Sequence, residues 1–193
     1  MRLRGLYAVT PDAPDMADKV RRALEGGIAM LQYRRKRRDL DEARAIAALA
    51  RSYKVPLIVN DDVELALEIG AEGAHLGRDD GDLGAARRRL GGRILGASCY
   101  NDPERARRAV AAGADYIAFG AVFASPTKPQ ALRAPLALFA MELGVPLCAI
   151  GGITLQNAPQ AIEAGADLLA VVSDLFDAAD IAARAAQYRR LFA

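Results

Sequence analysis

The chain has 193 residues, of which 52% are hydrophobic, and 26 basic against 24 acidic residues give a net charge of +2. This length and hydrophobic content suit one well-buried core, so we expect a single domain spanning residues 1–193. A nucleic-acid-binding protein would show a one-signed basic patch and stacking side chains. Here the charges are mixed, Trp is absent, and the arginine runs at 87–89 and 105–108 are expected to be solvated helix faces.

The apolar runs have the length of strands, and the N-terminal residues Met1 to Gly5 lack a secretory hydrophobic region. We therefore expect a soluble, cytoplasmic protein that does not cross a membrane. Cys99 and Cys148 lie in apolar runs without CxxC spacing, which predicts reduced core residues rather than a disulfide or a zinc site.

Strand-like runs alternate with amphipathic, Ala/Leu/Arg-rich helical patterns along the whole chain. In chain order the predicted strands are at about 3–9, from Ile28 onward, 56–60, 73–76, 93–98, from Tyr116 onward, 146–150 and from Leu168 onward. Every second strand follows a helix end with glycine, at Gly27, Gly70, Gly113 and Gly165, so the repeat is two βα units long. Each of these glycines is expected to be the left-handed residue that ends a helix.

Eight βα units predict a closed (β/α)₈ TIM barrel of the α/β class. A doubly wound, flavodoxin-like sheet would need only about five strands. Because such barrels usually have roughly 200 residues or more, the loops of this chain must be short. The functional site of a barrel of this type lies where its parallel strands end, so polar residues at those positions are the candidates for function.

The second strand continues into a polar run in which Gln32, Arg34 and Lys36 alternate with apolar or other residues. Since side chains alternate across a strand, these three share a face with Ile28 and Met30, which we assign to the barrel interior. Amide, guanidinium and ammonium groups at the end of a barrel strand predict a binding site for a polyanion such as a diphosphate.

Two acidic clusters follow the next two strands, Asn60-Asp61-Asp62 and Asp79-Asp80. Taken singly, each cluster is explained by helix capping. Taken together, Asp61 and Asp80 are expected to converge on one Mg²⁺ ion, which prefers oxygen ligands and is often shared with the phosphates of a substrate.

The later strands end in groups that can bind oxyanions. Hydroxyl and ammonium donors follow the fifth and sixth strands, and glycines with hydroxyl groups follow the seventh and eighth, where barrels of this type often bind phosphate. The candidates are Ser98, Ser125, Thr127, Lys128, Gly152, Val172 and Ser173. The single histidine, His75, lies inside an apolar strand and is interpreted as structural, and one histidine leaves no Ser/His/Asp or Cys/His arrangement to assemble. We therefore expect electrostatic catalysis of the departure of a phosphate group.

The motifs together resemble the thiamine-phosphate synthase family, also called thiamine-phosphate pyrophosphorylase. The similarity runs through nearly the whole chain and rests on Gly5-Leu-Tyr-Ala-Val-Thr-Pro-Asp12, Gln32-Tyr-Arg34-Arg-Lys36, Asn60-Asp61-Asp62, Gly73-Ala-His-Leu-Gly-Arg-Asp-Asp80, Gly96-Ala-Ser98, Ser125-Pro-Thr127-Lys128 and Ala149-Ile-Gly-Gly152-Ile.

This resemblance implies an enzyme that joins hydroxymethylpyrimidine diphosphate to a thiazole phosphate through a pyrimidine carbocation, with Mg²⁺ as cofactor and release of pyrophosphate. By position it implies that Asp61 and Asp80 bind the metal and that Ser98 lies near the pyrimidine and the pyrophosphate. It assigns Gln32, Arg34, Lys36, Asn60 and Lys128 to the diphosphate, and Ser125, Thr127, Gly152, Val172 and Ser173 to the thiazole phosphate. Lys128 and Ser98 are the implied catalytic residues.

The sequence departs from the family pattern at three positions. Tyr100 replaces a frequent His, Ser125 replaces a Thr, and Arg78 replaces a Gln. Two other functions share the barrel and remain alternatives: a related thiazole tautomerase, which needs no diphosphate or metal, and a non-catalytic barrel that binds thiamine phosphates. Asn60, Asp61, Asp80 and Lys128 favour the synthase.

Overall fold

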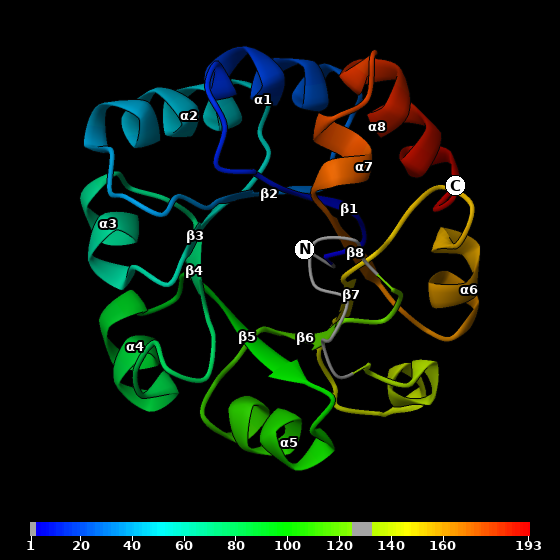
Figure 1. Cartoon of the computed structure of the whole chain (residues 1–193). Coiled ribbons are helices and arrows are strands. Elements are labelled where there is room, and N and C mark those ends of the chain that lie inside the picture. Colours follow the sequence, from blue (N-terminus) through cyan, green and yellow to red (C-terminus); the bar gives the residue numbers. More distant parts are fainter. Residues whose placement is uncertain (1–2, 125–132) are drawn as a thin grey trace.

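The chain folds into a closed barrel of eight parallel strands surrounded by helices, which confirms the predicted (β/α)₈ class (Figure 1). A computed structural model describes residues 3–124 and 133–193. The strands are β1 (Gly5–Val9), β2 (Met30–Tyr33), β3 (Leu57–Asn60), β4 (Gly73–Leu76), β5 (Ile94–Tyr100), β6 (Tyr116–Gly120), β7 (Leu147–Ile150) and β8 (Leu168–Val171). Each strand pairs with the next, and β1 pairs with β8 through the register Gly5 to Leu168, which closes the barrel.

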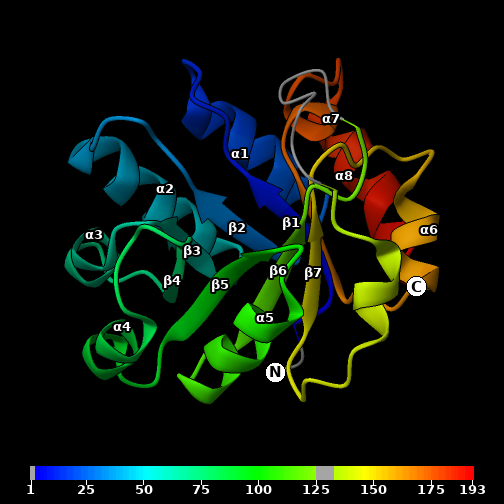
Figure 2. The ribbon, with the colours of Figure 1, turned by 60° about the horizontal axis from the view of Figure 1, so that its bottom comes forward.

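The helices form the outer ring seen in Figures 1 and 2. They are α1 (Met16–Glu25), α2 (Leu40–Ser52), α3 (Val63–Glu68), α4 (Leu83–Leu90), α5 (Pro103–Ala111), α6 (Ala158–Glu163), α7 (Ser173–Phe176) and α8 (Ile181–Arg190). Between β6 and β7 the described residues contain a 3₁₀ helix, η1 (Leu136–Ala140), visible as the short yellow-green coil between α5 and α6 in Figure 1.

Apolar side chains form two cores, one on each side of the strands. The inner core fills the barrel with alternate strand residues such as Tyr7, Met30, Tyr116 and Leu168. The outer core lies between strands and helices, where α1 buries one stripe at Met16, Val20, Ala23 and Leu24. This spacing places the four side chains on one face of the helix.

The inner core corrects one detail of the sequence prediction. β2 begins at Met30, so Ile28 precedes the strand and packs in the outer core rather than in the barrel interior. Met30 and Gln32 do point inward as predicted, and both are buried. The two cysteines are free and buried, Cys148 in the inner core and Cys99 in the outer core.

The predicted glycine repeat is also confirmed. Gly27, Gly70, Gly113 and Gly165 all have positive φ, between 68° and 113°, and each lies in the turn before an even-numbered strand. A left-handed residue lets the chain reverse after a helix within a few residues, and glycine adopts this conformation without a steric penalty. Short turns of this kind explain how 193 residues suffice for eight strands.

Candidate active site at the carboxyl ends of the strands

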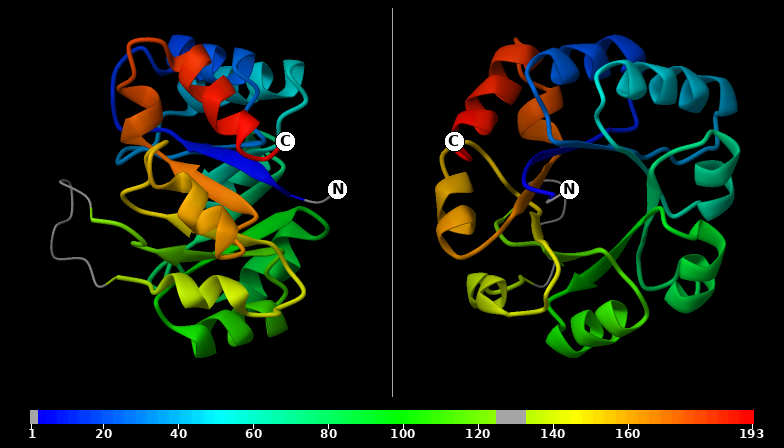
Figure 3. Two further views of the ribbon diagram at one scale, coloured as in Figure 1. Left: turned by 90° about the vertical axis from the view of Figure 1, so that its right-hand side faces the viewer. Right: turned by 180° about the vertical axis from the view of Figure 1, so that it is seen from behind.

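All eight strands are parallel, so their carboxyl ends meet at one face of the barrel. In the left panel of Figure 3 the N-terminus is at the right and the strands end toward the left, where α7 also lies. Thr10, Gln32 and His75 are polar side chains that are buried, and they lie at or near the carboxyl ends of β1, β2 and β4.

Two acidic residues from different strands meet at this face. Asp61 follows β3, and its carboxyl group lies within hydrogen-bonding reach of Asp80, which follows β4. Partial burial, followed by the hydrogen bond and the negative charge of Asp80, raises the pKa of Asp61 to about 6. Two carboxylates so close together repel one another unless a proton or a cation lies between them.

The capping explanation of these clusters is not what the structure shows for Asp61 and Asp80. Helix α3 is capped by Asp62, which accepts a hydrogen bond from Leu65 N at 2.7 Å, and α4 is capped by Asp82, which accepts from Ala85 N at 2.7 Å. Asp80 instead accepts from Gly77 N at 2.7 Å, which fixes the turn after β4. Because neither Asp61 nor Asp80 caps a helix, their carboxyl groups can interact with each other.

The carboxylate pair has polar neighbours from β2 and β3. Asn60 Nδ2 donates to Asp61 Oδ2 at 2.5 Å, and the charge of Arg34 acts to lower the pKa of Asp61. The backbone of Arg34 is fixed by Thr10, whose hydroxyl accepts from Arg34 N at 2.8 Å and donates to Arg34 O at 3.1 Å. Asn60, Asp80 and Arg34 therefore all act on the carboxyl group of Asp61.

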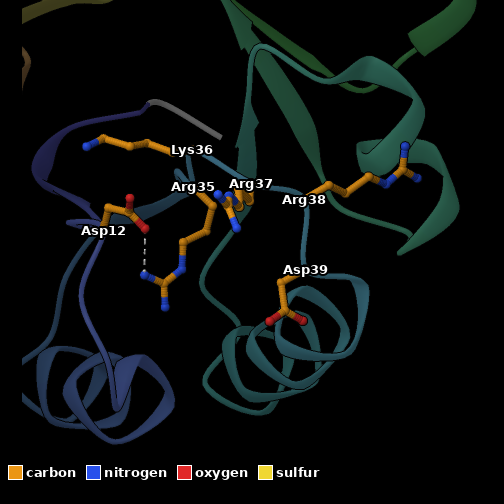
Figure 4. A pocket seen from close by; sticks show the side chains of 6 residues that line it. All are labelled: Asp12, Arg35, Lys36, Arg37, Arg38 and Asp39. Atoms are coloured by element: carbon orange, nitrogen blue, oxygen red, sulfur yellow. Dashed lines mark hydrogen bonds and ion pairs between the residues drawn. The ribbon is translucent and has the colours of Figure 1, made fainter.

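In the basic run after β2, Arg35 makes structural contacts, whereas Lys36 is exposed to solvent. Arg35 is held by a bidentate interaction with Glu42, at 2.7 and 2.5 Å, and by Asp12 at 3.1 Å, and these partners raise its pKa. Lys36 is exposed and lines an open pocket of about 440 Å³ (Figure 4). The pocket residues are Asp12, Arg35, Lys36, Arg37, Arg38 and Asp39. β2 ends at Tyr33, so the predicted alternation does not extend to Arg34 and Lys36, which are exposed beyond the strand.

Ser98 lies on β5 beside a bulge between β5 and β6, a feature that re-aims side chains. Its hydroxyl is 2.7 Å from His75 Nε2, and its carbonyl accepts from Arg105 Nε at 2.8 Å. Arg105 Nη2 also donates to Gly77 O at 2.9 Å, so this one side chain ties the ends of β4 and β5 together. The expectation that Arg105 belongs to a solvated helix face was therefore wrong.

Two of the three departures from the family pattern contact each other. The Arg78 guanidinium lies 4.9 Å from the centre of the Tyr100 ring, and Arg78 N donates to Tyr100 Oη at 3.2 Å. Tyr100 adopts a positive φ of 56° and is 38% exposed. These contacts hold the turn that carries Asp80, because Arg78 lies two residues before it.

Three of the five residues predicted for the thiazole phosphate, Gly152, Val172 and Ser173, lie after β7 and β8. Val172 precedes α7 and Ser173 begins it, with Ser173 exposed. Gly152 has a φ of 66°, and a Cβ there would lie 2.5 Å from Ala124 O and 2.6 Å from Phe123 O. Packing and backbone conformation therefore require glycine at 152. Ser125, Thr127 and Lys128 lie outside the described residues.

Sequence reasoning missed the polar residues that support the site. Arg105 and Tyr116 belong to no motif, Tyr7 and Thr10 lie in the motif at residues 5–12 but were given no role, and His75 was interpreted only as structural. His75 is buried, and burial lowers its pKa to about 4. The available signal was strand alternation, because Tyr7, His75 and Tyr116 fall on inward-facing positions of predicted strands.

Metal binding at this site would depend on two carboxylates. Over residues 3–124 and 133–193 there is no group of three or more His, Cys, Asp or Glu side chains that could hold a metal ion. A pair of carboxylates still fits Mg²⁺, which keeps several waters and takes its remaining ligands from substrate phosphates. Within the same ranges no helix is long and apolar enough to span a membrane.

A closed barrel with acidic and basic side chains where its strands end is typical of (β/α)₈ enzymes, whose active sites lie at this face. The family model described as thiamine monophosphate synthase matches residues 6–175. A thiamine-phosphate synthase of Aromatoleum aromaticum is 64% identical, with 99% of this chain and 97% of that protein covered. One of Azoarcus sp. strain BH72 is 57% identical, with 100% and 98% covered.

The solved structures agree with the sequence relatives. Thiamine phosphate pyrophosphorylase from Pyrococcus furiosus superimposes with a TM-score of 0.88 at 31% identity, covering 99% of this chain and 96% of that one. A 3-hexulose-6-phosphate synthase, at 17% identity and a TM-score of 0.74, shares the fold alone. The chain belongs to the thiamine monophosphate synthase family. Its activity is that of a thiamine-phosphate synthase, a transferase acting on pyrimidine and thiazole substrates.

Proposed function

We propose that the enzyme joins hydroxymethylpyrimidine diphosphate to a thiazole phosphate, releasing pyrophosphate to form thiamine phosphate, with Mg²⁺ held by Asp61 and Asp80. The observation that carries this proposal is the approach of these two carboxyl groups, from β3 and β4, while neighbouring aspartates cap the helices. When bound, Mg²⁺ supplies positive charge to a diphosphate and stabilises it as a leaving group.

The diphosphate is bound in this proposal by Gln32, Arg34, Lys36, Asn60 and Lys128. Arg34 supports the assignment best, because its charge acts on Asp61 and its backbone is fixed by Thr10. Ser98 lies near the pyrimidine and the pyrophosphate. The bond between the pyrimidine methylene carbon and the diphosphate oxygen breaks, its electron pair leaves with pyrophosphate, and the thiazole nitrogen forms the new bond to that carbon.

The protein's own contribution to this chemistry is electrostatic. Arg34, Lys36 and Lys128 place positive charge where negative charge grows on the leaving group, which stabilises the transition state. Ser125, Thr127, Gly152, Val172 and Ser173 bind the phosphate of the thiazole and place its nitrogen toward the pyrimidine. The thiazole nitrogen attacks through its own lone pair, so the bond-forming step needs no protein base.

We also propose that residues 1–193 form a single domain and that the enzyme works in the cytoplasm. The barrel includes strands from Gly5 to Val171 and α8 packs against α1 and β1, which supports one structural unit. Free, buried thiols at Cys99 and Cys148 fit a reducing compartment.

The decisive experiment mixes the purified protein with the pyrimidine diphosphate and the thiazole phosphate and measures pyrophosphate and thiamine phosphate, with and without Mg²⁺. We expect equal amounts of both products, formed only with the metal. A thiazole tautomerase would isomerise its thiazole substrate without the diphosphate. A non-catalytic barrel would bind thiamine phosphate in a calorimeter and release no pyrophosphate, and either result would contradict the proposal.

A further inference from the structure

A continuous chain of hydrogen bonds crosses the interior of the barrel and joins Gln32 to Ser98. Gln32 Nε2 donates to Tyr7 Oη at 2.6 Å, and Tyr7 Oη is 2.8 Å from Tyr116 Oη. Tyr116 Oη is 2.9 Å from His75 Nδ1, and His75 Nε2 is 2.7 Å from Ser98 Oγ. The five side chains come from β2, β1, β6, β4 and β5, so the chain spans the barrel without passing through solvent.

With the Gln32 amide oriented so that Nε2 donates, one arrangement of protons uses every donor of this chain. Tyr7 accepts from Gln32 and gives its single proton to Tyr116, because a Tyr7 proton directed elsewhere would have no acceptor among the five side chains. Tyr116 then donates to His75 Nδ1. A neutral imidazole that accepts at Nδ1 carries its proton on Nε2, so His75 donates to Ser98 Oγ. The proton of Ser98 is left free to point into the active site.

Burial and ring packing hold this arrangement in place. Tyr7 and Tyr116 are 1% and 0% exposed, and their rings meet edge to face with centroids 5.8 Å apart. The His75 ring stacks on Tyr116 at 5.5 Å. Reversing the direction of the chain would require Gln32 to turn its amide so that Oε1 accepts from Tyr7, and every later proton would have to move with it. The orientation of the Gln32 amide and the position of the Ser98 proton are therefore linked.

We propose that Tyr7 and Tyr116 are positioning residues that couple Gln32 to Ser98, so that Ser98 presents a hydrogen-bond donor to the pyrimidine diphosphate whenever Gln32 directs its oxygen away from Tyr7. The coupling rests on the proposed function for the assignment of Gln32 and Ser98 to that substrate. Neither tyrosine touches the substrate in this scheme. Each acts through the side chain at the end of the chain.

The first test is the tautomer of His75, which needs no substrate. His75 is the only histidine of the sequence, so ¹⁵N-histidine labelling of protein without a purification tag gives one pair of ring nitrogen signals. We expect a protonated Nε2 and an unprotonated Nδ1 in the wild type. In Tyr116→Phe, Nδ1 loses its donor, and we expect a mixture of tautomers. A wild-type imidazole protonated at Nδ1, or an unchanged spectrum in Tyr116→Phe, would overturn the proposal.

The second test measures the coupling itself through kcat/KM for the pyrimidine diphosphate. Gln32→Leu, Ser98→Ala and the double variant are compared in the wild type and in the Tyr7→Phe background. Residues that share a network have non-additive effects. We expect the double variant to retain at least about threefold more activity than the product of the single losses predicts, and this excess to vanish in Tyr7→Phe. Multiplicative losses in the wild type, or an excess that persists in Tyr7→Phe, would contradict the coupling.

Tyr188→Phe is the matched control, because it removes another buried tyrosine hydroxyl. Tyr188 Oη donates to Asp174 Oδ2 at 2.7 Å, outside the chain of five. We expect it to lower stability as the other two Phe variants do while leaving the His75 tautomer and the coupling of Gln32 and Ser98 as in the wild type. If the wild type released no pyrophosphate at all, the proposed function would fail, and the tautomer measurement would still decide whether the hydrogen-bonded chain exists.

Discussion

Asp61 and Asp62 are adjacent in the chain, yet they make contacts in different parts of the structure. Asp62 caps α3 by accepting a hydrogen bond from Leu65 N at 2.7 Å. Asp61 has a φ of 63°, and its carboxyl group lies within hydrogen-bonding reach of Asp80. A left-handed residue other than glycine is uncommon and is found where surrounding contacts hold it, often at functional sites. The turn at Asp61 thus directs the Asp62 carboxylate to the helix N-terminus and the Asp61 carboxylate toward Asp80.

This separation allows a controlled test of the metal site. We expect Asp61→Asn and Asp80→Asn each to lower turnover by at least about tenfold and to raise the Mg²⁺ concentration needed for half-maximal activity, because each removes a charged ligand. Steady-state kinetics over a Mg²⁺ titration provides the measurement. Asp62→Ala is the control: it should cost about 1 kcal/mol of stability and leave the Mg²⁺ requirement unchanged. Wild-type turnover in Asp61→Asn or Asp80→Asn would refute the assignment.

The contribution of His75 to the stability of the protein should fall in mild acid. Burial lowers its pKa from 6.5 to about 4. Above pH 6.5 the residue is neutral in both states and its contribution is fully present. Between pH 6.5 and 4 the unfolded chain binds a proton that the folded chain does not, so about 2–3 kcal/mol is lost as the pH falls.

Urea unfolding of the wild type and His75→Asn at several pH values isolates this effect from the carboxylates. The free energy of unfolding of the wild type minus that of the variant should be constant above pH 7 and should shrink toward pH 4.5. A difference that is the same at pH 7.5 and pH 4.5 would show that His75 is protonated to the same extent in the folded and unfolded states.

Lys128 and Ser173 should affect different kinetic constants. Lys128→Ala removes the positive charge proposed to stabilise the leaving pyrophosphate. By comparison with the loss of other catalytic hydrogen-bond donors, we expect kcat to fall by roughly 10²–10³-fold. Ser173→Ala removes one hydroxyl from the thiazole phosphate site and should raise the KM for that substrate alone. Varying each substrate in turn separates the two effects. If Lys128→Ala raised only the KM for the thiazole phosphate, Lys128 would belong to the thiazole phosphate site rather than to the diphosphate site.

Gly152→Ala should destabilise the fold before it reports on phosphate binding. The added Cβ would meet backbone oxygens at 2.5 and 2.6 Å, and φ is 66°. Gly144→Ala isolates the conformational part, since φ is 74° there and nothing lies within 4 Å of the added atom. We expect about 1 kcal/mol for Gly144→Ala, from the left-handed backbone alone, and a larger loss for Gly152→Ala. Thermal unfolding that ranks them equally would show that the loop after β7 moves aside.

The sequence by itself determined the barrel and the face on which its candidate site lies. Strand alternation placed Gln32 and Met30 inward, and the glycines before every second strand marked the turns, because both signals depend on local geometry that the neighbouring residues dictate. The polar residues at strand ends then had to meet, since parallel strands in a closed barrel end at one face. These signals do not depend on side-chain contacts between distant segments.

Only the tertiary structure decided which of the two adjacent carboxylates caps a helix and which buried side chains contact one another behind the site. Asp61 and Asp62 are equal candidates for capping in the sequence, and the backbone turn at Asp61 settles the choice. Tyr7 and Tyr116 are 109 residues apart and look like ordinary core aromatics, but closure of the barrel places their hydroxyls 2.8 Å from each other. No local pattern encodes such a contact, because it depends on the register of all eight strands together.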